Sequence, residues 1–179
     1  MRYYLKFLFL AFKDICLKYP YTKLLLIGSF GGAEERKFIQ DCGVPEKIID
    51  NNIVFVSWIR DDELIAAYYR MLFLDGKLNG VVVTPVAYRA FMVFMNAIAM
   101  RSPVVAFGEI DDKRLATRSS LLAHPRNIFN CIDDVFSASP SDIKKTIDTS
   151  YELAKNYYSL ENYIEKHIEL YERLVQSRN

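Results

Sequence analysis

The turn at residues 28–32 (GSFGG), which follows an apolar run, is the first segment suited to bind an anion. Its glycines allow backbone amides to approach a phosphate at the start of a helix. Glu34 and Glu35 come directly afterwards, and their carboxylates both complement the positive helix end and repel a phosphate. We therefore expect Gly28 and Ser29 to make at most an edge contact with a ligand.

A second turn, at residues 84–92 (TPVAYRAFM), contains no acidic side chain and places Arg89 at the mouth of the next helix. Free amides at a helix start, including those of Ala90 and Phe91, together with a guanidinium can hold a diphosphate. The alternative is that Arg89 is a solvated surface residue. Its position beyond the carboxyl end of a parallel strand, where such folds bind ligands, makes both interpretations reasonable.

Trp58 and Ile59 follow directly after another apolar run, at residues 52–57. An indole there can stack on a base or a sugar, or it can cover the edge of a sheet. The sequence favours the packing role, and it leaves open that the turn at residues 57–59 lies near a nucleobase.

Other polar residues suggest a metal site or a general base but have simpler explanations. Each of three Asp-Asp pairs stands near an expected helix start, where capping accounts for it without a metal. Neither histidine has a cysteine or carboxylate at metal-ligand spacing, and His167 is expected to be a packed, hydrogen-bonded core residue. We expect no metal. The pairs are Asp61–Asp62, Asp111–Asp112 and Asp133–Asp134, and the other histidine is His124.

Composition and charge exclude several classes of protein. The 23 lysines and arginines nearly cancel the 22 aspartates and glutamates, so no overall field attracts nucleic acid. The three cysteines are odd in number, widely spaced and set among apolar residues. This pattern indicates buried thiols in a reducing compartment, and hence a cytoplasmic protein, rather than a disulfide framework or a zinc site.

The first 20 residues predict an amphipathic helix. Lys6, Lys13 and Asp14 interrupt the apolar run, which argues against a signal peptide or a membrane span. Some aromatic side chains lie partly off the apolar stripe, which suggests an exposed patch for a partner, a subunit or a membrane surface. Alternatively, the helix is buried on both sides. The stripe is Leu5, Leu8, Phe9, Phe12, Ile15 and Cys16, and the patch is Tyr3, Tyr4, Phe7 and Phe9.

Continuous apolar runs at residues 23–28, 52–57, 80–84 and 103–107 predict strands that are covered on both faces. Helix-length segments at 33–40, 61–72 and 89–100 separate them. This alternation predicts an α/β fold with a doubly wound, Rossmann-like parallel sheet flanked by helices, in one domain over residues 1–179. Beyond it we expect a short helix, a short strand near residues 128–131, and helices at 143–157 and 159–174.

Three stretches in this order resemble the C-terminal, nucleotide-sugar-binding domain of GT-B fold glycosyltransferases of family 4 (glycosyl transferases group 1). They are YPYTKLLLIGSFGG with NNIVFVSWIRDDELIAAYYR, then VVVTPVAYRAFMVFMNAIAMRSPVVAF, then SLENYIEKHIELYERL. The resemblance implies half of a GT-B fold that binds a nucleoside diphosphate sugar and supports sugar transfer with retention, without a metal. It assigns no catalytic residue here.

The chain departs from that family at its paired glutamates, the Glu-x7-Glu motif. Arg89, or Tyr88 after a one-residue shortening, stands at the first glutamate, and Asn96 stands at the second. In the family the second glutamate bonds the ribose and the first lies beside the transferred sugar. Asn96 can still bond a hydroxyl, whereas Arg89 reverses the charge.

The sequence contains no counterpart of the family's acceptor-binding domain, so we expect that half to come from a separate subunit or from a homo-oligomer. Two functions remain open: a glycosyltransferase or glycosyltransferase subunit, and a degenerate, non-catalytic binding or assembly module. For the first function, the residues expected to bind the sugar donor are Gly28, Ser29, Trp58, Ile59, Arg89, Ala90, Phe91 and Asn96.

Overall fold

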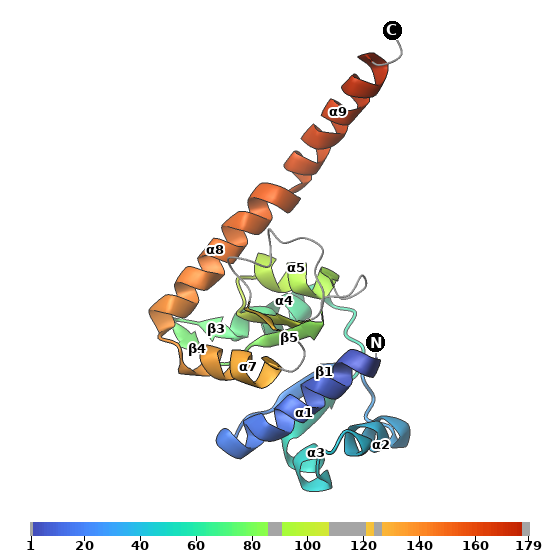
Figure 1. The fold of residues 1–179 in the computed structure, drawn as a ribbon, viewed down its shortest axis with the longest axis vertical. Helices are drawn as coiled ribbons and strands as arrows, with labels where there is room; N and C mark the ends of the chain where they lie inside the picture. Colours follow the sequence, from blue (N-terminus) through green and yellow to red (C-terminus); the bar gives the residue numbers. More distant parts are fainter. Residues whose placement is uncertain (1, 86–90, 108–120, 124–126, 177–179) are drawn as a thin grey trace.

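The computed structural model describes residues 2–85, 91–107, 121–123 and 127–176, and it shows an α/β protein (Figure 1). The N-terminal part contains a long helix, two strands and two short helices. Its elements are α1 (Arg2–Lys18), β1 (Leu24–Ile27), α2 (Ala33–Asp41), α3 (Glu46–Asn52) and β2 (Ile53–Val56).

The rest of the chain continues the alternation and ends in helices. A short hairpin, β3 (Phe73–Leu74) with β4 (Lys77–Leu78), follows α4 (Asp62–Met71). The remaining elements are β5 (Val82–Pro85), α5 (Phe91–Ala99), β6 (Val104–Phe107), β7 (Leu121–Ala123), α7 (Ile128–Ser137), α8 (Pro140–Tyr158) and α9 (Leu160–Gln176). The strand expected near residues 128–131 is therefore wrong, because those residues begin α7.

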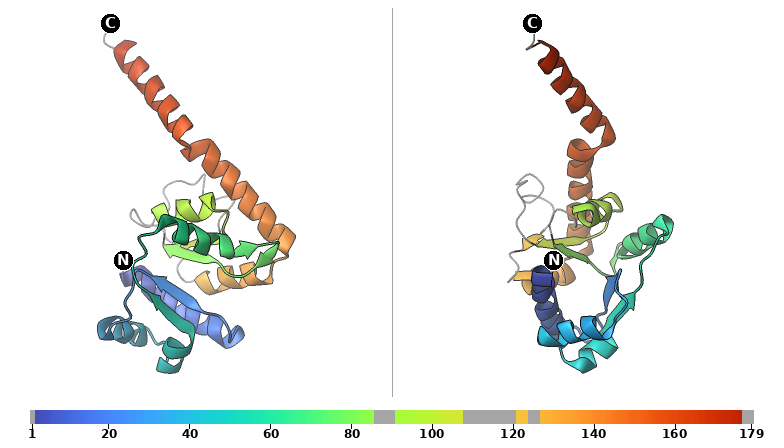
Figure 2. Two further views of the ribbon diagram at one scale, coloured as in Figure 1. Left: turned by 180° about the vertical axis from the view of Figure 1, so that it is seen from behind. Right: turned by 90° about the vertical axis from the view of Figure 1, so that its right-hand side faces the viewer.

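The described strands form two parallel sheets and the separate β3–β4 hairpin. In one sheet β1 pairs with β2, with Leu24 opposite Ile53, and in the other the order is β5-β6-β7, with Val82 opposite Val104. The α/β class with parallel strands is thus confirmed. The sheets lie apart in both views of Figure 2, so the four predicted strands are not hydrogen-bonded into one sheet.

Helix α1 packs into two hydrophobic cores at once. Leu8, Ala11 and Ile15 contact the core of the β5-β6-β7 sheet and α7. Residues on its other side, including Phe9 and Phe12, contact the core of β1, β2, α2 and α3. The predicted stripe is confirmed, but Phe9 is buried and does not belong to an exposed patch.

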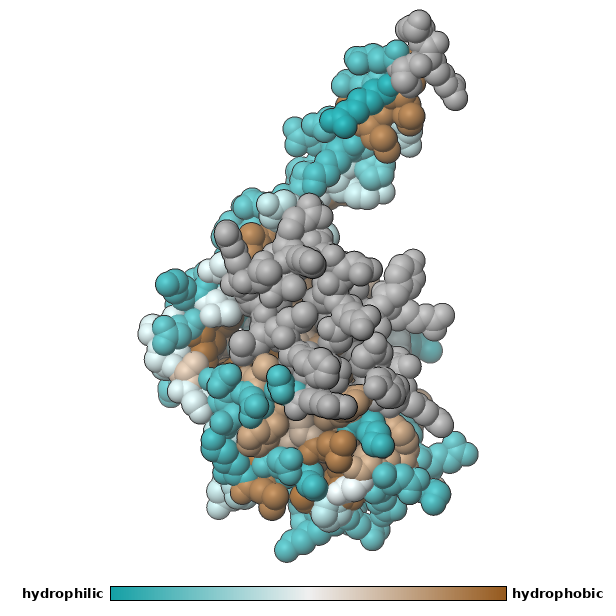
Figure 3. Space-filling model, in the orientation of Figure 1, coloured by the Kyte–Doolittle hydropathy of each residue, from teal (hydrophilic) through white to brown (hydrophobic). Residues whose placement is uncertain are grey.

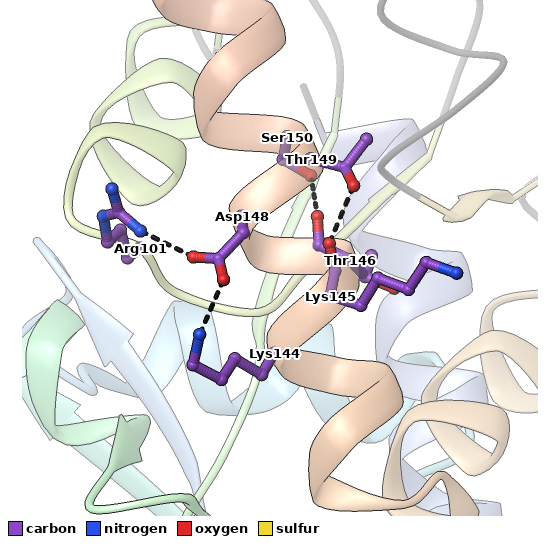
Figure 4. Close-up of polar contacts among 7 residues, drawn as sticks. All are labelled: Arg101, Lys144, Lys145, Thr146, Asp148, Thr149 and Ser150. Carbon is purple, nitrogen blue, oxygen red and sulfur yellow. Dashed lines mark hydrogen bonds and ion pairs between the residues drawn. The ribbon is translucent and has the colours of Figure 1, made fainter.

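Helix α8 is held against the end of α5 by an ion pair (Figure 4). Arg101 lies just beyond α5 with a positive φ of 55°, and its Nη1 is 2.5 Å from Asp148 Oδ1. Lys144, one turn earlier on α8, donates to the other oxygen of Asp148 at 2.8 Å. These contacts fix the start of the long α8–α9 arm.

Helix α9 extends away from the rest of the protein (Figures 1 and 3). None of its described residues is buried, and its apolar side chains gather on one side. His167 Nδ1 donates to the Tyr163 backbone carbonyl at 2.9 Å, and the His167 ring lies tilted against the Tyr163 ring with the ring centroids 4.0 Å apart. His167 is hydrogen-bonded as expected, but it is not in a core, because no residue of α9 is buried in the part of the chain that the structure describes. No helix among the described residues is long and apolar enough to cross a membrane.

The capping explanation holds for one aspartate pair and fails for another. The Asp61 carboxylate accepts the amides of Glu63 and Leu64 and caps α4, as predicted. Asp133 lies inside α7 instead and binds residues at the end of α1: Lys18 Nζ donates at 2.6 Å and the Tyr19 hydroxyl at 2.8 Å. Asp111–Asp112 lie outside the described residues.

This contact predicts a pH dependence of stability. The hydrogen bonds from Lys18 and then Tyr19 hold the pKa of Asp133 below its ordinary value. A lowered carboxyl pKa stabilises the fold above the unfolded pKa of about 4, and the contribution is lost as the pH falls through the folded value. We expect Asp133→Asn to lower the melting temperature at pH 7 and the difference from wild type to shrink below about pH 3. Asp134→Asn, at an exposed neighbour, is the control; equal melting temperatures for both variants at pH 7 would contradict the prediction.

Of the two adjacent glycines just before α2, only Gly31 is in a conformation that requires glycine. Gly31 has φ +65°, and a Cβ there would lie 2.6 Å from Phe55 Cγ, whereas a Cβ on Gly32 meets nothing within 4 Å. We expect Gly31→Ala to lower the free energy of unfolding by more than about 1 kcal/mol, and Gly32→Ala to change it by less than about 0.5 kcal/mol. Urea unfolding of both variants checks this, and equal losses would argue against the close approach to Phe55.

Candidate cleft at the carboxyl ends of the strands

A cleft of about 1530 Å³ separates the two parallel sheets. Strand β1 forms one wall and residues 81–83, which include the start of β5, form the other. Apolar side chains of α1, such as Phe12 and Ile15, line it as well, and α4 contributes Ile65, Tyr68 and Tyr69. The cleft is therefore mainly apolar, and its charged lining residues lie on either side of β1, with Lys18 and Lys23 before the strand and Glu34 and Glu35 after it.

Five of the eight residues predicted from the sequence line this cleft: Gly28, Ser29, Trp58, Ile59 and Asn96. Phe91 is the first residue of α5. Arg89 and Ala90 lie outside the described residues. These five residues come from three parts of the sequence, and the fold brings them to one cavity because β1, the segment that follows β2 and α5 all border it.

Trp58 lies against the turn that ends β1. Gly28 has φ +87° and donates its amide to the Val56 carbonyl at 2.8 Å, and a Cβ on Gly28 would lie 3.3 Å from Trp58 Cε3. The indole is nevertheless 72% exposed. The packing role favoured by the sequence accounts for little of its surface, so most of the ring is accessible to a ligand.

The backbone amides of the turn at residues 28–32 already bind a carboxylate of the protein itself. Glu35 Oε2 accepts the Gly32 amide at 3.2 Å, which is the half of a capping box that a glycine N-cap allows at the start of α2. A hydrogen bond from the Ser29 side chain, followed by those from nearby amides, holds the pKa of Glu35 below its ordinary value. The expectation that a first-turn carboxylate satisfies this helix end is confirmed for Glu35, and a phosphate would have to displace Glu35.

The lysines of the cleft are already engaged. Lys18 and Lys23 are its cationic lining residues among those the structure describes. Lys18 binds Asp133, and Lys23 donates to the Asn51 carbonyl. A ligand phosphate would therefore depend on groups near the start of α5, the region in which the sequence places Arg89.

Asn96 is the polar side chain that α5 contributes to the cleft. It is exposed, and its backbone carbonyl continues the helix by accepting the Met100 amide at 3.0 Å. Its side-chain amide carries both a donor and an acceptor, which suits a sugar or ribose hydroxyl. The cleft thus combines an aromatic surface, a side-chain amide and apolar walls.

No family model, curated protein or solved structure matches this chain. The interpretation of the cleft consequently depends on its own geometry. Among the described residues no cluster of three or more histidine, cysteine or carboxylate groups is arranged to hold a metal ion. Cys16 and Cys42 are buried and Cys131 is partly buried, all three as free thiols whose pKa burial raises.

The sequence did not identify the part played by α1 and α4. Their apolar stripes were visible, but a stripe indicates only that a helix face is covered and not which cavity it lines. One feature of the sequence could have indicated that α4 lines the cleft: Ile65 and Tyr68 lie on the side of the helix that its spacing makes available for burial.

Proposed function

We propose that this chain is a glycosyltransferase, or a subunit of one, that binds a nucleoside diphosphate sugar in the cleft and supports transfer of the sugar with retention. The observation that carries the proposal is that Gly28, Trp58 and Asn96, separate in the sequence, line one cleft. We place them in a doubly wound sheet that forms half of a GT-B fold, in line with the sequence resemblance.

Each part of the ligand has a proposed partner. Trp58 and Ile59 contact the base, because an accessible indole supplies a stacking surface for a nucleobase. Asn96 bonds a ribose hydroxyl. Arg89 and the first amides of α5 hold the diphosphate, and the carboxylates of Glu34 and Glu35 keep it away from the start of α2.

The proposed chemistry is electrostatic. As the bond between the sugar and the diphosphate breaks, negative charge grows on the leaving diphosphate, and a guanidinium with helix amides stabilises that charge without a metal. The acceptor must be oriented by a second subunit or a second copy of the chain, because transfer depends on positioning both reactants.

The experiment uses the single tryptophan of the chain, Trp58, as a reporter inside the proposed site. The purified chain is titrated with uridine, guanosine and adenosine diphosphate sugars and with the free diphosphates, and both indole fluorescence and melting temperature are followed. A saturable fluorescence change with one base, together with a rise in melting temperature, is expected. No change with any of these compounds would overturn the proposal.

The alternative is a non-catalytic module that keeps the fold and serves in binding or assembly. Arg89 and Asn96 at the positions of the two family glutamates favour it, because neither replaces a carboxylate function. The same titration separates the two functions. A chain that binds no nucleotide sugar but retains a single unfolding transition would be such a module.

A further inference from the structure

We infer that the cleft is the open form of a single sheet, and that β5 pairs in parallel with the free edge of β1. Closure gives the strand order β2-β1-β5-β6-β7 from the two existing sheets. Both strands already line the same cleft, so the movement brings together two segments of one chain and needs no other partner.

The backbone of β1 has groups aimed at the cleft. The Gly28 amide donates to Val56 of β2, and alternate residues of a parallel strand bond to the same neighbour. Leu24 and Leu26 therefore face β2, whereas Leu25 and Ile27 direct their N–H and C=O groups to the opposite edge. Among the described strands, β2 is the only one paired with β1.

The backbone of β5 is arranged in the same way. The Val82 amide donates to the Pro103 carbonyl beside β6 at 2.9 Å, so Val82 faces β6. By the same alternation, Val81 and Val83 direct their N–H and C=O groups away from β6. Both of these residues line the cleft. Each sheet thus presents to the same space a row of polar backbone groups that another strand can satisfy.

The side chains of β1 are also more exposed than is usual for a strand of apolar residues. All four residues of β1 are apolar, as in strands buried on both faces, yet Leu25 is 43% exposed and Ile27 49% exposed. Helix α4, which connects β2 to β5, has no buried residue, although its Ile65 and Tyr68 line the cleft. Closure would let α4 cover the exposed face of β1.

Helix α1 makes such a movement feasible without unpacking either core. Its two sides already contact the two sheets, through Ile15 in one core and Phe12 in the other. The sheets can rotate about α1 as two packed units, which is the behaviour of a hinge between elements.

The alternation of backbone groups requires Leu25 to lie opposite an even-numbered residue of the β5 segment, and we propose Val82. With Leu25 opposite Val82, the Leu25 amide donates to the Val81 carbonyl, and the Val83 amide donates to the Leu25 carbonyl. Gly28 then lies opposite Pro85, which has no N–H, so the ladder ends there. Under the proposed function, on which this last step rests, closure leaves the part of the cleft beyond the carboxyl ends of β1 and β5, where the Gly28 turn lies beside the end of β5 and a ligand would favour the closed form.

Paired cysteines test the register. Leu25→Cys with Val82→Cys places both thiols on one face of adjacent strands, at a spacing that a disulfide spans. The matched control, Leu25→Cys with Val83→Cys, shifts the pair by one residue and directs the thiols to opposite faces. We expect the first pair to oxidise at least about tenfold faster, with the bond located by peptide mapping to separate it from the native cysteines. Equal rates, or a faster control, would overturn the proposed register.

Hydrogen exchange on the unmodified chain tests closure without mutation. If β1 and β5 pair, the amides of Leu25 and Ile27 exchange at least about tenfold slower than unprotected amides; exchange at the unprotected rate would overturn closure. A repeat with saturating nucleoside diphosphate sugar addresses the proposed function separately. If exchange is slow and the ligand does not alter it, closure is supported and the proposed function is not. If the ligand binds but β1 is not protected, the proposed function is supported and closure is not.

Discussion

Replacing Phe107 by alanine is expected to lower the free energy of unfolding by about 3–5 kcal/mol. Phe107 is fully buried at the end of β6, in the core that contains Leu8 and Ile15 of α1 and Ile128 of α7. Removal of the ring loses its burial and leaves a cavity that these rigidly placed side chains fill only in part. Urea unfolding followed by circular dichroism measures the loss.

Met92→Ala on α5 is the matched control, because Met92 is 62% exposed and should change stability by no more than about 0.5 kcal/mol. Because α1 contributes to both cores, we also expect Phe107→Ala to unfold in one transition rather than two. Similar losses for the two variants would contradict the assignment of this core, and two separate transitions would show that α1 does not couple the sheets.

Local patterns in the sequence were sufficient to predict most elements. The runs that became β1, β2, β5 and β6 are apolar and bounded by turn residues, and these signals depend only on neighbouring residues. The same is true of helix starts such as Ser139, whose hydroxyl accepts the Asp142 amide at 3.2 Å. Such interactions form within one turn of chain and are therefore readable without a fold.

The secondary structure of one short apolar segment was predicted wrongly because its hydrophobic period was ambiguous. Residues 128–131 were expected to form a strand, but Ile128 and Ile132 recur at helical spacing and are both buried, in the core shared with α1. Four residues are too few to distinguish the helical period of 3.6 residues from the alternation of a strand. The partner surface, α1, lies more than 100 residues away, and no local signal supplies it.

The candidate site was predictable in its parts but not in its arrangement. Turns that follow apolar strands mark the carboxyl ends of a parallel sheet, which is why Gly28 and Trp58 were singled out, whereas Asn96 was singled out by the family resemblance. Which strand edges are paired is a non-local property, so the separation of β1 from β5 could not be inferred. The ion pair between Lys18 and Asp133 was missed for the same reason, since each residue taken alone matches a surface charge.

The accessible indole of Trp58 leads to the prediction with the largest expected effect on binding. Under the proposed function, Trp58→Ala should weaken binding of the nucleoside diphosphate sugar by about 1–3 kcal/mol, which is roughly 5- to 150-fold in Kd. Trp58→Phe should restore most of the affinity, because a phenyl ring still offers a stacking face. Isothermal titration calorimetry is the appropriate measurement, since the alanine variant has no tryptophan fluorescence.

Stability without ligand distinguishes this role from simple packing on Gly28. Because Trp58 is 72% exposed, its removal takes little apolar surface out of the core, and the melting temperature of the free Trp58→Ala chain should stay close to that of wild type. A packing role predicts the opposite pair of results, namely a lower melting temperature and an unchanged Kd. The two observables therefore respond differently, and together they decide whether the indole at the mouth of the cleft serves the ligand or the fold.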